Sequence, residues 1–236
     1  MEFIFLIQAR LGSTRLPKKV LKPIFENLSI LEIIYNRILL SKYSNKENIY
    51  VLTSSNKSDD ELVIFLESKG IKYFRGDENC VFDRFQTFLN FNKITNEYFF
   101  RICSDNPFLE PVFIDNLCEV ALKSKIKHDY ISYVDFDGIA IIQKKYGLFC
   151  ELIRTKTFLK YNSEHDEYTQ ENVTPFLYRS GNYNIYYLGL PNEFLKNEFN
   201  LSIDTQEDYL KAKLIFTKTN KLYTNYLELI ELIKEY

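Results

Sequence analysis

The sequence lacks several features that mark whole classes of protein. It contains no apolar run of 18 residues, and the apolar stretch over residues 1–6 is too short for the core of a secretory signal, so neither membrane insertion nor export is expected. Its four cysteines are far apart, with no CxxC pair and only two histidines beside them. This pattern argues against a soft-metal site and favours buried thiols in a reducing cytoplasm.

Concentrated positive charge and internal boundaries are also absent. The 30 Lys and Arg residues are scattered among 32 Asp and Glu residues, giving a net charge of −2 without the basic stripe that general nucleic-acid binding needs. No repeat, low-complexity tract or linker divides the chain. We therefore expect residues 1–236 to form a single domain, with no nucleic acid or membrane as a partner.

Hydrophobic patterns in the first half alternate between two kinds of element. Continuous apolar runs predict buried strands, whereas apolar residues at helical spacing, introduced by signals such as the Ser29–Glu32 capping box, predict helices. The expected strands cover residues 3–7, 49–53, 71–74 and 98–103. One expected helix begins near residue 29, and the others cover residues 59–68, 81–90 and 111–124. This order predicts a Rossmann-like, three-layer α/β fold with a mostly parallel sheet.

The second half departs from this alternation. Residues 130–134 and 139–143 flank an Asp-Gly turn, which predicts a hairpin or meander. A helix over 164–178 is expected to kink or end at Pro175. Further strands are expected at 183–188 and 201–203, and further helices at 205–217, capped by Thr205 with Asp208, and at 223–234. We expect a β-rich excursion around residues 130–190 within the single domain.

The chemistry begins in residues 8–19, directly after the first strand. This segment holds Arg10, Arg15, Lys18 and Lys19 together with Gly12, at the strand end where open α/β sheets bind ligands. Arginine and lysine pair with phosphate oxygens, and glycine lets backbone N–H groups approach them. A polyphosphate would satisfy this loop, which is neither a Walker loop nor a dinucleotide fingerprint. The alternative is an ordinary solvated basic loop.

A carboxylate follows a later strand at the same expected edge. Asp105 lies just past the strand over 98–103, where it could hold Mg²⁺ against phosphate oxygens. A helix N-cap is the competing role, but Pro111 places the next helix start several residues later. Metal binding is therefore the favoured interpretation.

The segment IQARLGSTRLPKKVL resembles the N-terminal signature of the CMP-sugar synthetases, which include acylneuraminate, 3-deoxy-manno-octulosonate and spore-coat polysaccharide type cytidylyltransferases. It is most similar to the spore-coat type. The resemblance implies that this loop binds the phosphates of CTP and favours CTP over UTP or GTP. The loop residues implied in nucleotide binding are Gln8, Ala9, Arg10, Leu11, Gly12, Ser13, Arg15 and Lys19.

Further segments resemble the same family in the same order. The nucleoside-side positions are Thr53, Ser54, Arg75, Gly76, Asp83 and Arg84, and RICSDNPF resembles RxxGDxP, which adds Ser104 and Asp105. Asp83 and Arg84 could instead form an exposed pair at a helix start. The late motif SIDTQED implies that Asp204 shares magnesium with Asp105, the two carboxylates converging on one cation.

The acceptor side resembles the family less closely. Phe149 stands where the spore-coat type has aspartate, and residues 135–146 lack its TYPDG form, which implies an unusual acceptor. The implied acceptor residues are Arg101, Asn106, Glu151, Glu171 and Thr174. The last three lie in a region that family members also use for dimer contacts. His165, a lone histidine in a polar segment, is interpreted as a surface residue.

Together these features predict a cytoplasmic, homodimeric, Mg²⁺-dependent cytidylyltransferase. It would transfer CMP from CTP to a small anionic acceptor, release pyrophosphate and serve surface-glycan or capsule biosynthesis. Arg10, Arg15, Lys19 and Asp105 are the expected catalytic residues, with no dedicated protein base. The alternatives are a sugar-1-phosphate uridylyl- or guanylyltransferase, a glycosyltransferase and a non-catalytic nucleotide-binding protein.

Overall fold

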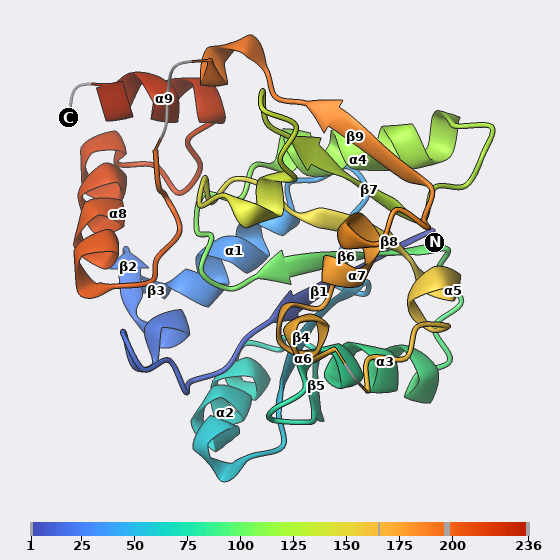
Figure 1. The fold of residues 1–236 in the computed structure, drawn as a ribbon. Helices are drawn as coiled ribbons and strands as arrows, with labels where there is room; N and C mark the ends of the chain where they lie inside the picture. Colours follow the sequence, from blue (N-terminus) through green and yellow to red (C-terminus); the bar gives the residue numbers. More distant parts are fainter. Residues whose placement is uncertain (1, 165, 196–198, 235–236) are drawn as a thin grey trace.

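A seven-stranded sheet forms the centre of the protein. The computed structural model describes residues 2–164, 166–195 and 199–234, and its sheet has the order β5-β4-β1-β6-β8-β7-β9 (Figure 1). The strands are β1 (Phe3–Gln8), β4 (Ile49–Ser54), β5 (Tyr73–Gly76), β6 (Tyr98–Cys103), β7 (Tyr130–Val134), β8 (Glu151–Arg154) and β9 (Ile185–Gly189). β8 runs antiparallel to β6 and β7, whereas the other paired strands are parallel. The predicted α/β class with a mostly parallel sheet is confirmed.

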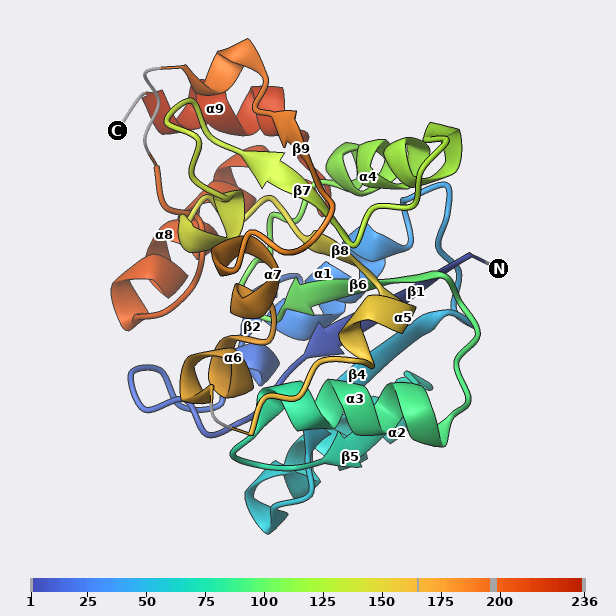
Figure 2. The ribbon, with the colours of Figure 1, turned by 45° about the vertical axis from the view of Figure 1, so that its right-hand side comes forward.

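Helices cover both faces of this sheet (Figures 1 and 2). The face with the larger hydrophobic cluster packs against α1 (Ile30–Ile38), α2 (Asp60–Ser68), α4 (Pro111–Lys123), α8 (Gln206–Thr219) and α9 (Tyr226–Lys234). The other face packs against α3 (Val81–Phe91), α5 (Thr155–Phe158), α6 (Glu167–Asn172) and α7 (Pro175–Arg179). The three layers are therefore helices, sheet and helices.

β1 shows why both faces are covered. Phe3, Phe5 and Ile7 belong to the larger cluster, whereas Ile4 and Leu6 belong to the smaller one. Successive side chains of a strand point to opposite faces, so a continuous apolar run needs a hydrophobic layer on each side. Each of these side chains is at most 4% exposed, which contributes about 1.5–3 kcal/mol per side chain.

Two predicted capping boxes define helix starts. At α1 the Ser29 hydroxyl accepts from the Glu32 amide at 3.2 Å, and the Glu32 carboxylate accepts from the Ser29 amide at 2.8 Å. Thr205 and Asp208 repeat this arrangement at α8, with distances of 3.2 and 2.8 Å. Both predictions are confirmed, and the second box fixes the chain directly after Asp204.

The predicted break at Pro175 is also confirmed. α6 ends at Asn172 and α7 begins at Pro175, with Val173 between them at φ 71°. The amide of Thr174 donates to the carbonyl of Asn172 at 2.9 Å, which closes a tight turn around this valine. The turn separates α6, which packs against α3, from the short helix α7.

Two predicted strands are absent from the described residues. Residues 139–143 contain the 3₁₀ helix η3 (Ile141–Gln143) and one isolated bridge between Val134 and Ala140, so the predicted hairpin is wrong. Residues 201–203 form no strand and pair with none of the described strands. The amides of Leu201 and Ile203 donate instead to single carbonyls in other loops, Leu201 to Lys145 at 3.1 Å and Ile203 to Asp105 at 2.8 Å.

Several elements were not predicted. β8 lies between β6 and β7, and the short hairpin of β2 (Pro23–Phe25) and β3 (Leu28–Ser29) turns through two left-handed residues, Glu26 and Asn27. The remaining short 3₁₀ helices are η1 (Lys19–Leu21), η2 (Lys57–Asp59) and η4 (Asn192–Phe194). Residues 130–190 thus contribute three strands to the main sheet.

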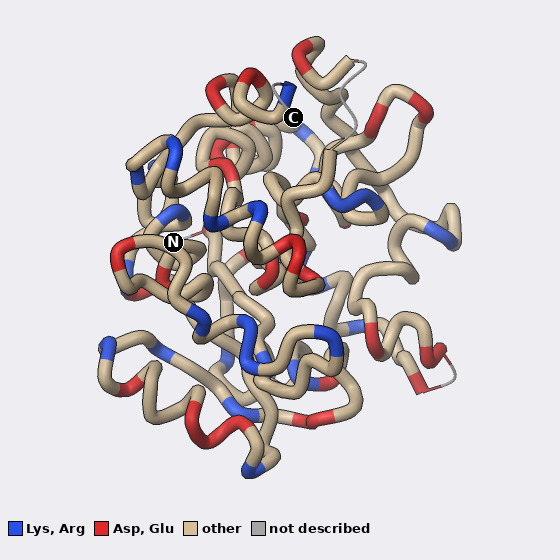
Figure 3. Tube along the Cα trace, turned by 90° about the vertical axis from the view of Figure 1, so that its left-hand side faces the viewer, with Lys and Arg blue, Asp and Glu red and all other residues tan. Residues whose placement is uncertain are grey.

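Surface charge is mixed, as the scattered sequence pattern predicts. On the face shown in Figure 3, segments with Lys and Arg alternate with segments with Asp and Glu. Among the described helices, none has the length and low polarity needed to cross a bilayer. All four cysteines are free; Cys118 and Cys150 are buried as expected, whereas Cys80 and Cys103 are half-buried. His165 lies outside the described residues.

Candidate active site

A cleft of about 470 Å³ lies where β1 and β6 end. These strands are parallel and in register at Gln8 and Cys103, so the loops that follow them leave the sheet at the same edge. The predicted residues that line the cleft are Gln8, Ala9, Arg10, Gly12, Ser13, Arg15, Lys19, Arg84, Arg101, Ser104, Asp105, Glu171 and Asp204. Thr14, Val81, Cys103 and Asn172 line it as well and were not assigned from the sequence.

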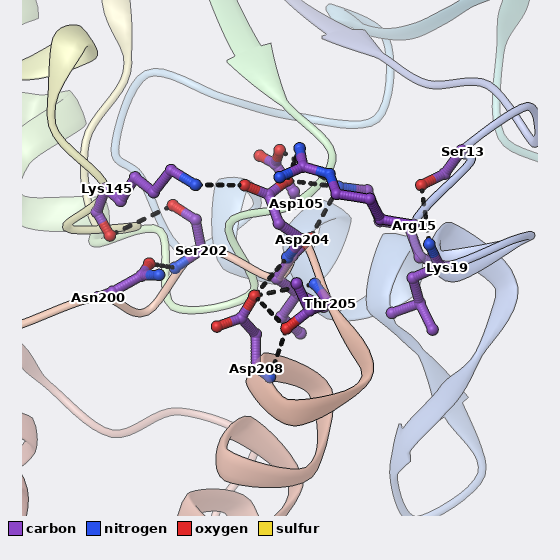
Figure 4. Close-up of polar contacts among 12 residues, drawn as sticks. Ser13, Arg15, Lys19, Asp105, Lys145, Asn200, Ser202, Asp204, Thr205 and Asp208 are labelled. Atoms are coloured by element: carbon purple, nitrogen blue, oxygen red, sulfur yellow. Dashed lines mark hydrogen bonds and ion pairs between the residues drawn. The ribbon is translucent and has the colours of Figure 1, made fainter.

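Lys19 joins the two predicted metal carboxylates (Figure 4). Its ammonium lies 3.4 Å from Oδ2 of Asp105 and 3.3 Å from Oδ1 of Asp204, and it donates to the carbonyl of Ile203 at 2.7 Å. The Ile203 amide in turn donates to the carbonyl of Asp105 at 2.8 Å. Segments almost 100 residues apart therefore place both carboxylates around one positive charge.

Asp204 is surrounded by cations. Arg15 lies 3.4 Å from its Oδ1, on the side of Lys19, and Lys145 lies 2.8 Å from its Oδ2 (Figure 4). Burial acts to raise the pKa of Asp204, but the hydrogen bond from Lys145 and the charge of Lys19 outweigh it, so the pKa is lowered. The carboxylate is therefore ionised and available to a cation near neutral pH.

Arg10 and Arg84 add two further positive charges to the lining of the cleft. Arg10 is exposed and has no ion-pair partner among the described residues. Arg84 is 1% exposed. Burial is the main cause that lowers its pKa; the charge of Asp59 opposes this shift, and the charge of Arg10 adds to it. The suggestion of an exposed Asp83–Arg84 pair is wrong for Arg84, which donates to the carbonyl of Asp77 at 2.7 Å. Asp83 alone is exposed and lies outside the cleft.

The loop after β1 is anchored by buried residues. Leu11 and Leu16 are at most 5% exposed, and the Ser13 hydroxyl accepts from the Leu16 amide at 3.3 Å. The amide of Leu11 donates to the buried carboxylate of Asp59 at 2.7 Å. Lys18 turns away from the cleft and pairs with Glu61. The loop therefore presents Arg10, Gly12 and Arg15 to the cleft while its leucines fix it to the core.

Asp59 was not predicted as a functional residue. Its Oδ2 accepts from the Thr53 hydroxyl at 3.1 Å, from the Ser54 amide at 3.2 Å and from the Ser54 hydroxyl. Thr53 and Ser54 are consequently buried and lie outside the cleft lining. Because Asp59 also holds Leu11, it connects the end of β4 to the loop after β1.

Arg75 and Gly76 also lie outside the cleft lining. Arg75 donates to the carbonyls of Ser54 and Asn56 at 2.9 and 2.7 Å and pairs with Asp60 at 2.7 Å, which braces the turn before α2. A Cβ at Gly76 would lie 2.9 Å from Cγ of Arg84. Glycine at this position therefore leaves room for the Arg84 side chain.

A buried polar network supports the floor of the cleft. Arg101 donates to Glu151 at 2.5 Å and to the side-chain oxygen of Gln8 at 3.0 Å. Glu151 is completely buried and also accepts from Tyr130 at 2.5 Å and from Thr174 at 2.7 Å. Burial works against the charge of Arg101, but its neighbours Cys103 and Glu151 outweigh burial, and the pKa of Arg101 is raised.

This network separates the predicted acceptor residues into two groups. Arg101 and Glu171 line the cleft, whereas Glu151 and Thr174 face each other inside the protein. Asn106 is 8% exposed and accepts from the Ser202 hydroxyl at 2.9 Å, which ties the segment before Asp204 to the loop after β6. Three of the five residues thus shape the cleft from behind its surface.

The donor set suits a hard divalent cation. Asp105 and Asp204 offer carboxylate oxygens, the ligands that Mg²⁺ and Mn²⁺ prefer, and both already contact the positive charge of Lys19. Among the described residues, no group of three or more His, Cys, Asp or Glu side chains could hold a metal. A cation here would therefore take two protein carboxylates and complete its shell with water and phosphate oxygens.

Comparison with known proteins defines the class. Residues 4–235 match the family described as Cytidylyltransferase. The chain is 30% identical over 231 residues to the spore coat polysaccharide biosynthesis protein SpsF of Bacillus subtilis, covering 93% of this chain and 88% of that protein. It is also 30% identical over 204 residues to the 3-deoxy-manno-octulosonate cytidylyltransferase of Wigglesworthia glossinidia brevipalpis, covering 84% and 73%.

A solved structure agrees with this result. The chain superimposes on a cytidylyltransferase from Leptospira borgpetersenii with a TM-score of 0.84 and 27% identity, covering 100% of this chain and 94% of the other. The protein is therefore an enzyme of the nucleotidyltransferase class. It belongs to the cytidylyltransferase family, and the resemblance stated from its sequence motifs is confirmed.

Proposed function

We propose that the protein uses CTP and transfers CMP to a small anionic acceptor with release of pyrophosphate. The observation that carries the proposal is the meeting of the loop cations with Asp105 and Asp204 around Lys19. A triphosphate is bound by several positively charged side chains. A metal ion that bridges the triphosphate to the protein needs carboxylate ligands. The cleft has both within one set of contacts.

The loop residues bind and orient the nucleotide in this proposal. Arg10 and Arg15 are exposed to the cleft and would neutralise the triphosphate and the departing pyrophosphate. Lys19, held between two carboxylates, would move its ammonium to a phosphate oxygen when a divalent cation takes those carboxylates.

Mg²⁺ is the proposed metal, with Asp105 and Asp204 as its protein ligands. When bound, the ion would polarise the α-phosphate and make an acceptor hydroxyl more acidic. Lys145 and Lys19 lower the pKa of Asp204, so the side chain is the carboxylate that a divalent cation requires. One solved structure with a TM-score of 0.61 and 11% identity, Rv0371C of Mycobacterium tuberculosis, was obtained as a manganese complex.

The acceptor is proposed to be a sugar acid or another small anion, for the synthesis of a surface polysaccharide. The names of two relatives support this, because one concerns spore coat polysaccharide and the other 3-deoxy-manno-octulosonate. We further propose that Arg101, Asn106, Glu151, Glu171 and Thr174 shape the acceptor side. The segment 130–190 is proposed to serve acceptor binding and homodimer formation, which light scattering of the purified protein will test.

Product mass provides the direct test. The purified protein is incubated with Mg²⁺ and each of CTP, UTP, GTP and ATP, together with a panel of sugar acids, sugar phosphates and phosphonates. We expect a CMP conjugate and pyrophosphate with CTP. Activity confined to UTP or GTP with sugar 1-phosphates would instead establish a uridylyl- or guanylyltransferase.

Two variants connect the activity to the site. Asp105→Asn retains the size of the side chain but removes a carboxylate, so turnover is expected to fall by about 10²–10³-fold. Asp83→Asn is the matched control, because Asp83 is exposed and outside the cleft lining, and its turnover should stay within about twofold. Unchanged turnover in Asp105→Asn would remove Asp105 from the proposed catalytic group.

A further inference from the structure

Lys145 approaches Asp204 from the side opposite to the phosphate-binding loop. Arg15 and Lys19 contact Oδ1 of Asp204, whereas Lys145 contacts Oδ2 at 2.8 Å. Figure 4 shows Lys145 on one side of the carboxylate and the two loop cations on the other. Lys145 was not assigned from the sequence, and it belongs to the segment between η3 and β8.

The backbone of Lys145 is fixed while its side chain is free to move. Its carbonyl accepts from the Leu201 amide at 3.1 Å and from the Ser202 hydroxyl at 3.3 Å. Gly147 makes this approach possible: its φ is 72°, and a Cβ there would lie 2.7 Å from the carbonyl carbon of Leu201. The side chain of Lys145 is nevertheless 57% exposed, so its ammonium can leave Asp204 without unfolding the segment.

A second hollow adjoins this lysine. It has a volume of about 330 Å³ and is lined by Lys144, Lys145, Tyr146, Phe199 and Asn200. The lining combines two ammonium groups with two aromatic rings and an amide. Such a lining suits the charged end of a polar molecule better than an apolar ligand.

The in-line geometry of CMP transfer explains why a positively charged side chain is useful beside Asp204. The attacking oxygen must approach the α-phosphorus from the side opposite to the departing pyrophosphate. The loop cations occupy the Oδ1 side of Asp204, which leaves its Oδ2 side, where Lys145 lies, for the anionic group of the acceptor. Binding of a divalent cation to Asp204 would also repel Lys145 and leave its ammonium in need of an anion.

We propose that Lys145 is a specificity residue that exchanges the carboxylate of Asp204 for the anionic group of the acceptor. This inference rests on the proposed function, because it requires a cation and a triphosphate on the other side of Asp204. In the free protein Lys145 competes with the divalent cation for Asp204. In the loaded protein it selects acceptors that carry a carboxylate, phosphate or phosphonate.

The exchange predicts opposite effects of Lys145→Ala on two ligands. Removal of a half-exposed ion pair should tighten Mn²⁺ binding to the protein alone by about two- to fivefold, as measured by electron paramagnetic resonance of the free ion. Loss of a charged contact should raise the acceptor KM by about 10- to 100-fold, while kcat and the KM for CTP change less than threefold.

Lys221→Ala is the matched control. The Lys221 side chain is also 57% exposed and ion-paired, but its partner is Glu228 at 3.1 Å, and it lines neither the cleft nor the second hollow. Its substitution should leave both Mn²⁺ binding and the acceptor KM within about twofold. Lys145→Arg, which keeps the charge, should restore most of the acceptor affinity lost in Lys145→Ala.

The outcomes separate the two proposals. If wild-type protein turns over CTP and Lys145→Ala has an unchanged acceptor KM, or if Mn²⁺ binding is not tightened, the inference about Lys145 is wrong and the proposed function stands. If the wild-type protein converts no acceptor with CTP, the proposed function fails and the acceptor role of Lys145 fails with it.

Discussion

Replacement of Asp59 by asparagine tests the connection between the sheet and the loop after β1. Asp59 is 1% exposed, and its two carboxylate oxygens accept from four donors, of which the Leu11 amide at 2.7 Å is the one in the loop. Asparagine has one acceptor oxygen and one donor nitrogen. In either orientation of the amide, its NH₂ group faces a buried backbone N–H, that of Leu11 or that of Ser54, and the two donors cannot pair.

The magnitude follows from these contacts. A hydrogen bond to a charged acceptor contributes about 1.5–3 kcal/mol, and a buried donor left unpaired costs about 1–3 kcal/mol. Oδ2 accepts three of the bonds, so the amide nitrogen is expected at the position of Oδ1, facing Leu11. We expect Asp59→Asn to lower the free energy of unfolding by about 2–4 kcal/mol and the Tm by roughly 5–15 °C.

Two measurements check this expectation. Urea denaturation gives the stability loss, and calorimetric titration with CTP should show about tenfold weaker binding because the loop has lost its anchor. Asp60→Asn is the control. Asp60 is 52% exposed and, within the described residues, has Arg75 as its ion-pair partner, so its loss should stay below about 1 kcal/mol. Equal stability of the two variants would refute the role assigned to Asp59.

Two further predictions concern buried charge and pH. Glu151→Gln leaves the buried charge of Arg101 uncompensated, so urea denaturation should show that the free energy of unfolding falls by about 3–5 kcal/mol. Glu171→Gln is the control: Glu171 is exposed, and its substitution should change the free energy of unfolding by less than about 0.5 kcal/mol. The pKa of Asp204 is lowered in the folded state, so its contribution to stability is complete above its ordinary value of 3.8 and is lost as the pH falls further. Stability measured from pH 6 to pH 2 should consequently decline less steeply in Asp204→Asn than in the wild-type protein; an identical decline would contradict the assignment.

Local signals were sufficient for much of the fold. The capping boxes at Ser29 and Thr205 involve residues three positions apart, so the sequence contains both partners. Strands of the parallel sheet were visible for a similar reason, because burial on both faces produces continuous apolar runs. Residues 201–203 show the limit of this reasoning: Leu201 and Ile203 flank Ser202 in an alternation typical of a strand, but a strand also needs a neighbouring strand, and none of the described strands pairs with them.

The site was predictable where a residue faces the cleft directly and not where it acts through another residue. The cations of the loop and Asp105 were assigned from their position after strands. Asp59 was missed because the sequence places it at the start of the expected helix 59–68, where an acidic residue is common; its side chain makes no cap hydrogen bond and instead contacts Leu11. Lys145 was missed because its partner, Asp204, is distant in sequence and joined to it only by the fold.

The position of β8 has a consequence for the order in which the chain can fold. β8 follows β7 in the sequence but lies between β6 and β7 in the sheet, and its register sets Glu151 beside Arg101. During synthesis β1, β4, β5 and β6 can pair as soon as they emerge, whereas β7 has no neighbour until residues 151–154 have left the ribosome. Until then the free edge of β6 presents unpaired backbone groups to solvent, together with Arg101, which is buried in the folded protein. During this interval the edge of β6 can pair with a wrong strand.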